Sequence, residues 1–178
     1  VTNKLLLLAQ AEHADAERQL APLDLAAAAL HCAEALAAQA DRRGIDLGLD
    51  LPAAPGGVPV QAEPALLDAL ISNLLDNALR YTPAGGRVTV SVLVLPGGAA
   101  ELRVLDNGPG IAPADLPHVF ERFYRAAGDS EGSGLGLAIV REAAGRFGAQ
   151  VDLAPAPEGS GLLARVRFAP LAPGAAIR

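Results

Sequence analysis

The amino-acid sequence predicts one mixed domain of α-helices and β-strands around a shared hydrophobic core. Helical and alternating apolar patterns follow one another along the 178 residues, a length typical of a single domain that needs no disulfide or metal. Hydrophobic residues make up 51% of the chain, which excludes a disordered protein. Because aromatic residues make up only 3% and Met and Trp are absent, the core is expected to consist of Ala, Leu, Val and Ile.

Charge and hydropathy argue against several classes of function. The formal net charge is −6 and no stretch is rich in Lys or Arg, so neither nucleic acid nor an anionic membrane surface is expected as a partner. No apolar run approaches the roughly 20 residues of a membrane span. The single cysteine, Cys32, cannot form an internal disulfide and fits a reducing compartment. The chain lacks an initiating Met and a signal peptide, so we expect it to be a fragment of a longer protein.

Helix signals bound the first two predicted elements. A helix is expected over residues 1–20, and Pro22 follows it as a breaker. Asp24 is a favourable N-cap for a second helix over residues 25–43, and Gly44 is a favourable residue to end it.

Two strands and the strongest helix follow. Alternation of apolar with polar or small residues predicts a strand over residues 45–51, and residues 58–60 are expected to form a short strand that its proline confines to an edge. A helix is predicted over residues 63–81, with Pro64 in its first turn. Its buried stripe consists of apolar residues at helical spacing, Leu67, Ile71, Leu74 and Ala78.

The second half of the chain is predicted to add four strands and two helices. The segments, in order, are strands over 87–95 and 99–105 joined by a Pro-Gly-Gly turn, a short helix near 114–120, a helix from Gly132 to about Phe147, strands over 149–153 and 162–168, and a tail over 170–178.

The helix over residues 63–81 carries a row of polar side chains. Asn73, Asn77 and Arg80 stand at i, i+4 and i+7, so they share a stripe beside the apolar one. An Asn carbonyl is a neutral oxygen ligand that suits Mg²⁺, and Arg80 could neutralise phosphate. A solvated face of an amphipathic helix explains the same residues equally well.

An acidic residue is followed by two glycines where a predicted strand ends, in Asp106-Asn-Gly-Pro-Gly110. A partly buried Asp106 carboxylate would seek a donor such as an exocyclic amine, and the glycines would allow a close approach. The alternative is an ordinary turn between two extended segments.

Two further segments could contact phosphate. Gly132-Ser-Gly134-Leu-Gly136 opens a helix, whose free N–H groups form a natural anion site, although a flexible hinge is an equal alternative. Just before it, Phe120-Glu-Arg122-Phe123-Tyr-Arg125 combines aromatic side chains that could pin a loop with arginines that could reach phosphate. Ordinary anchoring of a loop by aromatics is the alternative there.

The order and separation of these four segments resemble the N, G1, F and G2 boxes of the sensor histidine kinases of two-component systems. The resemblance covers residues 24–168 and implies a Bergerat-type ATP-binding fold. This is an α/β (α+β) two-layer sandwich with a mixed, mostly antiparallel sheet packed on about three helices. The resemblance implies ATP as the nucleotide and Mg²⁺ as its metal. The matching segments are Asn73-x-x-x-Asn77, Asp106-x-Gly108-x-Gly110, Phe120-x-x-Phe123 and Gly132-x-Gly134-x-Gly136.

Carried over residue by residue, the resemblance implies roles at the phosphate end of the nucleotide. Asn77 would bind Mg²⁺, with Asn73 supporting the metal and the phosphates. Arg80, where the family more often has Lys, would contact phosphate, and Arg125 is a candidate for the γ-phosphate. We expect these four residues to form the catalytic set.

The resemblance also implies roles around adenine. Tyr81 would lie against the ring, and Asp106 would accept a hydrogen bond from its amino group, which favours ATP over GTP. Residues 111–131 would form a lid over the nucleotide. The remaining expected nucleotide-binding residues lie in the loops and around the glycines, namely Gly108, Gly110, Ile111, Phe120, Phe123, Gly132, Gly134, Leu135 and Gly136.

The resemblance divides the chain into three parts. Residues 1–21 resemble the end of the dimerisation and histidine-phosphotransfer domain, residues 22–170 the catalytic ATP-binding domain, and residues 171–178 a tail. No histidine of the chain has the context of the family's phosphoacceptor.

We therefore expect this fragment to present the γ-phosphoryl group of ATP to a histidine supplied in trans. That histidine would belong to the protein's own dimerisation domain, in a homodimer, and would relay the phosphoryl group to the receiver domain of a response regulator. The fragment itself is expected to be cytoplasmic and to make no membrane contact, whereas the full-length protein would lie in the bacterial inner membrane.

Three alternatives have different chemistry. ATPases related to gyrase and the Hsp90 chaperones carry a Glu four residues before the metal-binding Asn, as general base for water; here that residue is Asn73, which cannot take a proton. Anti-sigma factor kinases usually lack the Phe-x-x-Phe segment. A non-catalytic interaction domain is the third, and the presence of Asn77, Asp106 and the glycines argues against it.

Overall fold

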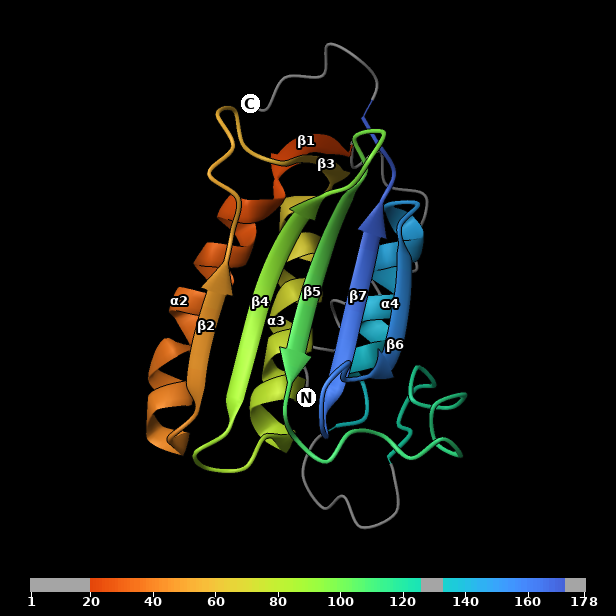
Figure 1. Cartoon of the computed structure of the whole chain (residues 1–178). Helices are drawn as coiled ribbons and strands as arrows, with labels where there is room; N and C mark the ends of the chain where they lie inside the picture. The colour runs from red at the N-terminus through yellow and green to blue at the C-terminus, as the bar shows by residue number, and fades with distance from the viewer. Residues whose placement is uncertain (1–19, 126–132, 172–178) are drawn as a thin grey trace.

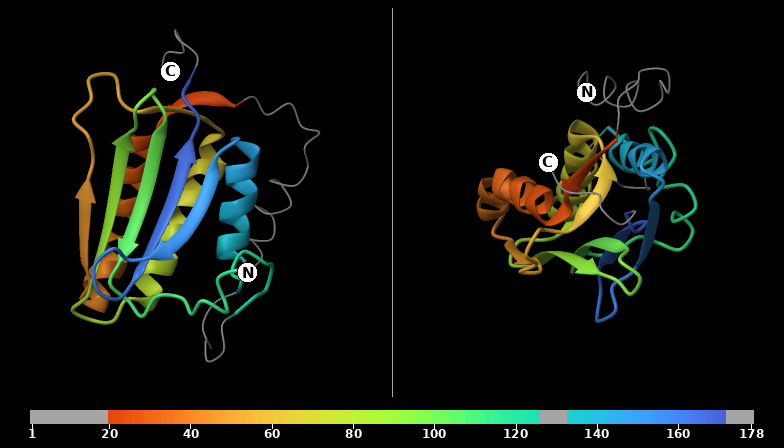
Figure 2. Two further views of the ribbon diagram at one scale, coloured as in Figure 1. Left: turned by 45° about the vertical axis from the view of Figure 1, so that its right-hand side comes forward. Right: turned by 90° about the horizontal axis from the view of Figure 1, so that it is seen from above.

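The computed structural model describes residues 20–125 and 133–171. Within these residues, three helices cover one face of a five-stranded sheet, and the opposite face of the sheet carries no helix (Figures 1 and 2). The α/β sandwich expected from the sequence is therefore confirmed. The predicted helix over residues 1–20 and the tail fall almost entirely outside the described residues.

The main sheet is mixed, with the strand order β2-β4-β5-β7-β6. Strands β2 and β4 are parallel, and the other neighbouring pairs are antiparallel. Alternate residues of β4 are buried against the helices, as the period of two requires. The bounds are β2 (Asp46–Asp50), β4 (Arg87–Val94), β5 (Ala100–Asp106), β6 (Gln150–Pro155) and β7 (Leu162–Phe168).

A second, two-stranded sheet lies at the upper end of the domain in Figure 1. It pairs β1 (Ala21–Asp24) with β3 (Pro59–Ala62) in antiparallel register. The predicted short strand near residues 58–60 is thus present. Strand β1 was not predicted, because Pro22 indicates the end of a helix and does not reveal a strand partner far along the chain.

Helix α2 (Leu25–Arg43) has the ends that the sequence predicts. The Asp24 carboxylate accepts hydrogen bonds from the N–H of Ala26 at 3.0 Å and of Val58 at 2.9 Å, so one side chain caps α2 and fixes the chain before β3. At the other end Gly44 has a φ of 64°, a left-handed conformation that suits glycine.

Helix α3 (Pro64–Tyr81) lies between α2 and α4 (Gly136–Arg146) and contacts β5. The predicted stripe is buried, with Leu67 1% and Ile71 0% exposed. Packing on both sides leaves the carboxyl-terminal half of α3 in a fixed position relative to the ends of β5 and the start of α4. This end of the sheet, at the bottom of Figure 1, holds most of the predicted site.

One predicted helix and one predicted helix boundary were wrong. Residues 114–120 form consecutive turns instead of a helix, because Pro117 has no N–H to donate to the preceding turn. Helix α4 begins at Gly136 and not at Gly132, which lies outside the described residues. Gly134 has a φ of 66°, which is incompatible with a right-handed helix.

We predict that Asp24→Ala lowers the free energy of unfolding by about 1–2 kcal/mol, because both α2 and the segment before β3 lose a hydrogen-bond acceptor. Urea unfolding followed by circular dichroism measures this change. Asp41→Ala, an exposed change near the end of the same helix, is the control. Equal stability of the two variants would show that the Asp24 carboxylate has no such role.

Candidate functional site

The buried amide of Asn73 has one satisfied and one unsatisfied end. Its side chain is 6% exposed, and its Nδ2 donates to the carbonyl of Ala69 at 2.7 Å. Its Oδ1 is buried and has no hydrogen-bond partner among the described residues. An unpaired buried acceptor costs free energy, so this oxygen is an available ligand atom inside the domain.

The start of helix α4 lies directly against the two predicted amides. A β-carbon built at Gly136 would lie 3.2 Å from Oδ1 of Asn73 and 3.5 Å from Oδ1 of Asn77. Glycine therefore allows the first residue of α4 to approach both side chains. The structure thus brings together two of the predicted segments, and the second of them includes the N-terminal end of a helix, where N–H groups favour anions.

Arg80 lies on the predicted stripe but is engaged with a neighbour. Its Nη2 is 2.9 Å from Oδ2 of Asp76, and both side chains are about a quarter exposed. Arg43 donates to the Arg80 carbonyl at 2.8 Å, which ties this end of α3 to α2. The charge of Arg80 is thus partly neutralised by Asp76, a partner that was not predicted from the sequence. Tyr81, next along, is 45% exposed.

Asp106 is the last residue of β5 and is 6% exposed. Its Oδ1 accepts from the N–H of Gly108 at 2.9 Å and from the N–H of Leu162 at 3.3 Å. Burial raises the pKa of this carboxyl, and the two backbone N–H groups offset only part of that effect. Oδ2 accepts no hydrogen bond from the described residues, so one carboxylate oxygen is open to a donor.

A second buried carboxylate on the same strand, that of Glu101, has a structural role and serves as a comparison for Asp106. Glu101 is fully buried on the other face of β5 and is bonded to Arg103 at 2.6 Å and to Arg167 at 2.8 Å. Burial opposes its ionisation, but the two guanidinium groups outweigh burial and lower its pKa. Within the described part of the chain Asp106 has only backbone N–H partners, which distinguishes the two acids chemically.

The two glycines after Asp106 lie in close backbone contacts. A β-carbon at Gly108 would lie 2.9 Å from the Tyr81 carbonyl, so the chain passes directly over the end of α3. A β-carbon at Gly110 would lie 2.9 Å from the Gly161 carbonyl, in the turn before β7. The G1-like segment therefore contacts both α3 and the β6–β7 turn.

The aromatic segment is joined to the glycines before α4 through the backbone. The N–H of Phe123 donates to the Gly134 carbonyl at 2.8 Å, and a β-carbon at Gly134 would lie 2.7 Å from the Phe123 backbone. The Phe123 side chain is 62% exposed, whereas Phe120 is partly buried. Tyr124 anchors the same segment by donating from its hydroxyl to Asp115 at 2.6 Å.

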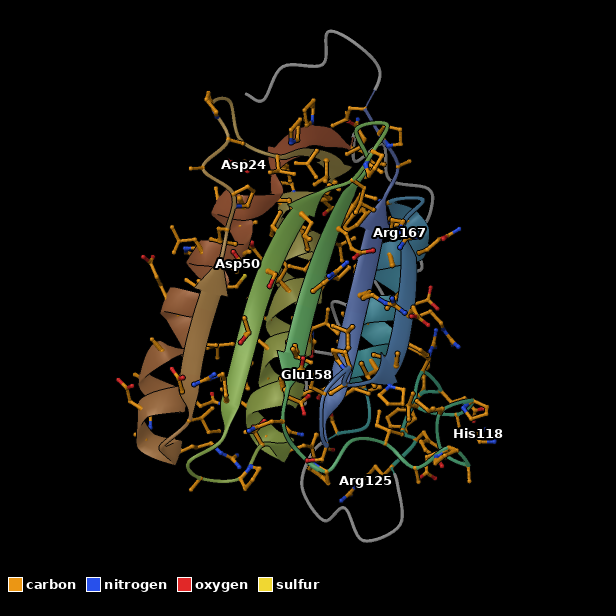
Figure 3. All side chains as sticks on the ribbon, viewed as in Figure 1. Asp24, Asp50, His118, Arg125, Glu158 and Arg167 are labelled. Carbon is orange, nitrogen blue, oxygen red and sulfur yellow. The ribbon has the colours of Figure 1, made fainter. Side chains whose placement is uncertain are left out.

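The remaining predicted residues differ in their surroundings. Ile111 is half-buried, and Arg125 is exposed at the lower end of the molecule in Figure 3. Leu135 is fully buried in a small cluster with Ala69 and Ile139, so its side chain is part of the core. Only its backbone could face a ligand.

Gly161 was not among the residues predicted from the sequence. A β-carbon there would overlap the Asp106 carbonyl oxygen, so no other residue fits without a shift of the backbone. The signal was the Gly-Ser-Gly run that precedes the strand over residues 162–168, combined with the pairing of that strand with the one that ends at Asp106.

Comparison with known proteins places the chain in a family. Residues 62–172, more than half of the chain, match the family described as histidine kinase-, DNA gyrase B-, and HSP90-like ATPase. The fold of this class of protein is a two-layer sandwich, and here amides, an acid and glycines lie at one end of its sheet. The chain belongs to the histidine kinase-, DNA gyrase B- and HSP90-like ATPase family.

Within that family its relatives are sensor histidine kinases. The chain is 46% identical over 130 residues to the sensor protein QseC of Salmonella typhi, covering 72% of this chain and 27% of that protein. The mycobacterial sensor histidine kinase MprB has a similar structure, with a TM-score of 0.69 and 32% identity over 84% of this chain and 96% of that one.

Full-length ShkA in complex with AMPPNP has a TM-score of 0.78 and 29% identity, over 96% of this chain and 35% of that one. The chain spans only about a quarter to a third of the length of its curated relatives. Within residues 20–125 and 133–171, no helix is both long and apolar enough to cross a membrane.

We predict that Asp106→Asn raises the free energy of unfolding at about pH 7. The folded carboxyl has a pKa above its ordinary value of 3.8, so the folded state binds the proton more tightly than the unfolded chain does. The free energy of unfolding therefore falls as the pH rises from the pKa of the unfolded chain through the higher pKa of the folded state. The introduced amide avoids this loss because it carries no charge.

Urea unfolding of the parent and of Asp106→Asn between about pH 4 and about pH 7 measures the difference in their free energies of unfolding. This difference is expected to narrow as the pH falls toward about 4. Asp50→Asn, at the exposed end of β2 in Figure 3, controls for the exchange of a carboxylate for an amide. A variant less stable than the parent at neutral pH would contradict the prediction.

Proposed function

We propose that this chain binds Mg-ATP and presents the γ-phosphoryl group to a histidine on the dimerisation domain of the full-length protein. The observation that supports this most is the approach of Gly136, at the start of α4, to the amides of Asn73 and Asn77. This approach places the neutral amide oxygens, which can bind a hard cation, beside a helix N-terminus, which can bind phosphate.

The residues present fit the metal. The unpaired buried Oδ1 of Asn73 and the side chain of Asn77, for which no hydrogen bond to a described residue is found, are oxygen donors of the kind that Mg²⁺ accepts. In our proposal Asn77 holds the ion and Asn73 supports it. Mg²⁺ supplies charge neutralisation on the phosphate oxygens.

Asp106 recognises adenine in this proposal. Its open Oδ2 accepts from the exocyclic amino group, while Oδ1 is held by the backbone. Tyr81, exposed and adjacent to Gly108, covers one face of the ring. That ShkA forms a complex with AMPPNP, which contains the same base, is consistent with this role.

Phosphate contacts are proposed for Arg80, Arg125 and the N–H groups at the start of α4. Arg80 would contact phosphate from its ion pair with Asp76. Gly132 falls outside the described residues, and the lid over residues 111–131 stays a prediction. Transfer would depend on positioning and charge stabilisation of the γ-phosphoryl group.

The chain's own residues argue against rapid ATP hydrolysis. Asn73 occupies the place of the general base in the related ATPases, and its amide cannot accept a proton at neutral pH. The phosphoacceptor would therefore be an imidazole from a partner helix, followed by the receiver domain of a response regulator. The similarity to the sensor protein QseC and the sensor protein kinase PmrB supports a kinase role. The order of transfer and an inner-membrane location of the full-length protein are parts of our proposal.

We predict that Asn77→Ala and Asp106→Asn each weaken Mg-ATP binding by about 10- to 100-fold, because each removes a contact to a charged or strongly polar group. Isothermal titration calorimetry measures the dissociation constants, and circular dichroism checks that the variants are folded. Asp50→Asn is expected to bind Mg-ATP as the parent does. Parent-like affinity in both site variants would refute the proposed function.

We predict that Gly134→Ala impairs phosphoryl transfer more than folding or ATP binding. A methyl group there would push against the Phe123 backbone at a residue with positive φ. Transfer from labelled ATP to the separately supplied histidine domain is the measurement. Gly145→Ala, inside α4 with open space around it, is the matched control and should transfer normally. Equal loss of transfer and of ATP affinity would contradict this prediction.

A further inference from the structure

The turn between β6 and β7 closes directly on Asp106. Figure 3 labels Glu158 in this turn, at the same end of the sheet as Arg125. The turn is closed by the N–H of Ala156, which donates to the Gly161 carbonyl at 3.1 Å. At Gly161 the backbone lies so close to Asp106 that a β-carbon would overlap its carbonyl oxygen and come within 3.0 Å of the Cα of Asn107.

The register of the sheet explains why this contact reaches the carboxylate. Strands β5 and β7 are antiparallel, and their last pair is Leu105 with Leu163. One residue further, Leu162 stands opposite Asp106, and its N–H donates to the side-chain Oδ1 at 3.3 Å. The close approach at Gly161 is what brings this N–H to the carboxylate.

The two carboxylate oxygens of Asp106 therefore have different tasks. Oδ1 accepts two backbone N–H groups, one from Gly108 in the following turn and one from Leu162 across the sheet. Oδ2 accepts none from the described residues. Two bonds from different elements fix the plane of the carboxylate, whereas one bond would leave it free to rotate.

We propose that Gly161 is a positioning residue for base recognition: its close packing on Asp106 places the Leu162 N–H on Oδ1 and so directs Oδ2 toward an amino donor on the bound purine. This inference rests on the proposed function, since it assumes that Asp106 faces the base. It extends that function to a specific part of the chain, the β6–β7 turn, which contains none of the residues expected from the sequence.

The proposal has a chemical consequence for the choice of nucleotide. Adenine carries an amino group at C6, whereas hypoxanthine carries a carbonyl there. A fixed, acceptor-only oxygen favours the amino group and repels the carbonyl. A carboxylate that can rotate loses this preference. Gly161 should therefore affect the ratio of the affinities for ATP and ITP more than the affinity for the triphosphate itself.

The test compares Mg-ATP and Mg-ITP binding to the parent and to Gly161→Ala by isothermal titration calorimetry. We expect Gly161→Ala to lose about 10-fold or more in ATP affinity with little change for ITP. Gly159→Ala lies in the same turn, also at positive φ, but its β-carbon would meet no atom, so it controls for strain in the turn. It is expected to keep the parent ratio.

A second variant removes the donor itself. Leu162→Pro deletes the N–H at the first residue of β7, a place in a strand that tolerates proline better than its centre. It should lower the ATP-to-ITP ratio as Gly161→Ala does. Equal losses for both nucleotides in the Gly161→Ala protein, or the same change of ratio in Gly159→Ala, would overturn the proposal.

A measurement without nucleotide separates this proposal from the proposed function. Titration of the Asp106 side-chain carboxyl carbon by NMR should show a higher pKa in Gly161→Ala than in the parent, because a stabilising N–H is lost from the carboxylate. If the parent binds ATP and ITP equally but the titration shifts, base recognition fails and positioning holds. If the titration does not shift, the positioning role is wrong whatever the parent binds.

Discussion

The predicted site depends on close approaches of backbone segments at glycines, where a β-carbon would be crowded by its neighbours or would overlap them. The chain at Gly108 lies on the end of α3, the start of α4 at Gly136 lies on the amides of α3, and the turn at Gly161 lies on the end of β5. Each contact joins two elements that are distant in sequence. A β-carbon would overlap its neighbour at Gly161, force a shift at Gly108 and displace the Asn73 side chain by a few tenths of an ångström at Gly136. Glycine therefore allows the polar groups of α3 and β5 to lie near the same end of the domain.

Much of the fold could be predicted from local signals. Asp24 and Gly44 delimit α2 because capping acts within a few residues, and α3 could be predicted from apolar residues at helical spacing. Because α3 packs against α2, α4 and β5, it buries more residues than the predicted stripe contains. Strand β1 could not be predicted in this way, because it pairs with β3, far along the chain. The short helix predicted near residues 114–120 failed for the opposite reason: a helical pattern was present, but Pro117 interrupts its hydrogen bonds.

Site residues could be predicted where the type of the side chain indicates its role, and less well where the role depends on tertiary contacts. Amides on a packed helix and an acid at a strand end made Asn73 and Asp106 candidates, and the order of the four segments, through the family resemblance, singled them out. The pairing of Arg80 with Asp76 was available from their spacing but was not considered, since Asp76 reads as an ordinary surface charge. Gly161 required knowledge of which strand lies beside β5.

The contrast between two acids of β5 separates folding from function in this domain. Glu101 meets two arginines, and its lowered pKa means that ionisation stabilises the fold. Asp106 has a raised pKa, and neither its Oδ2 nor the buried Oδ1 of Asn73 has a hydrogen-bond partner among the residues that the structure describes. Both residues therefore lower the stability of the unliganded domain. A ligand that supplies a donor to one and a cation to the other would recover this free energy on binding, which is why the least satisfied polar groups of the core mark the site.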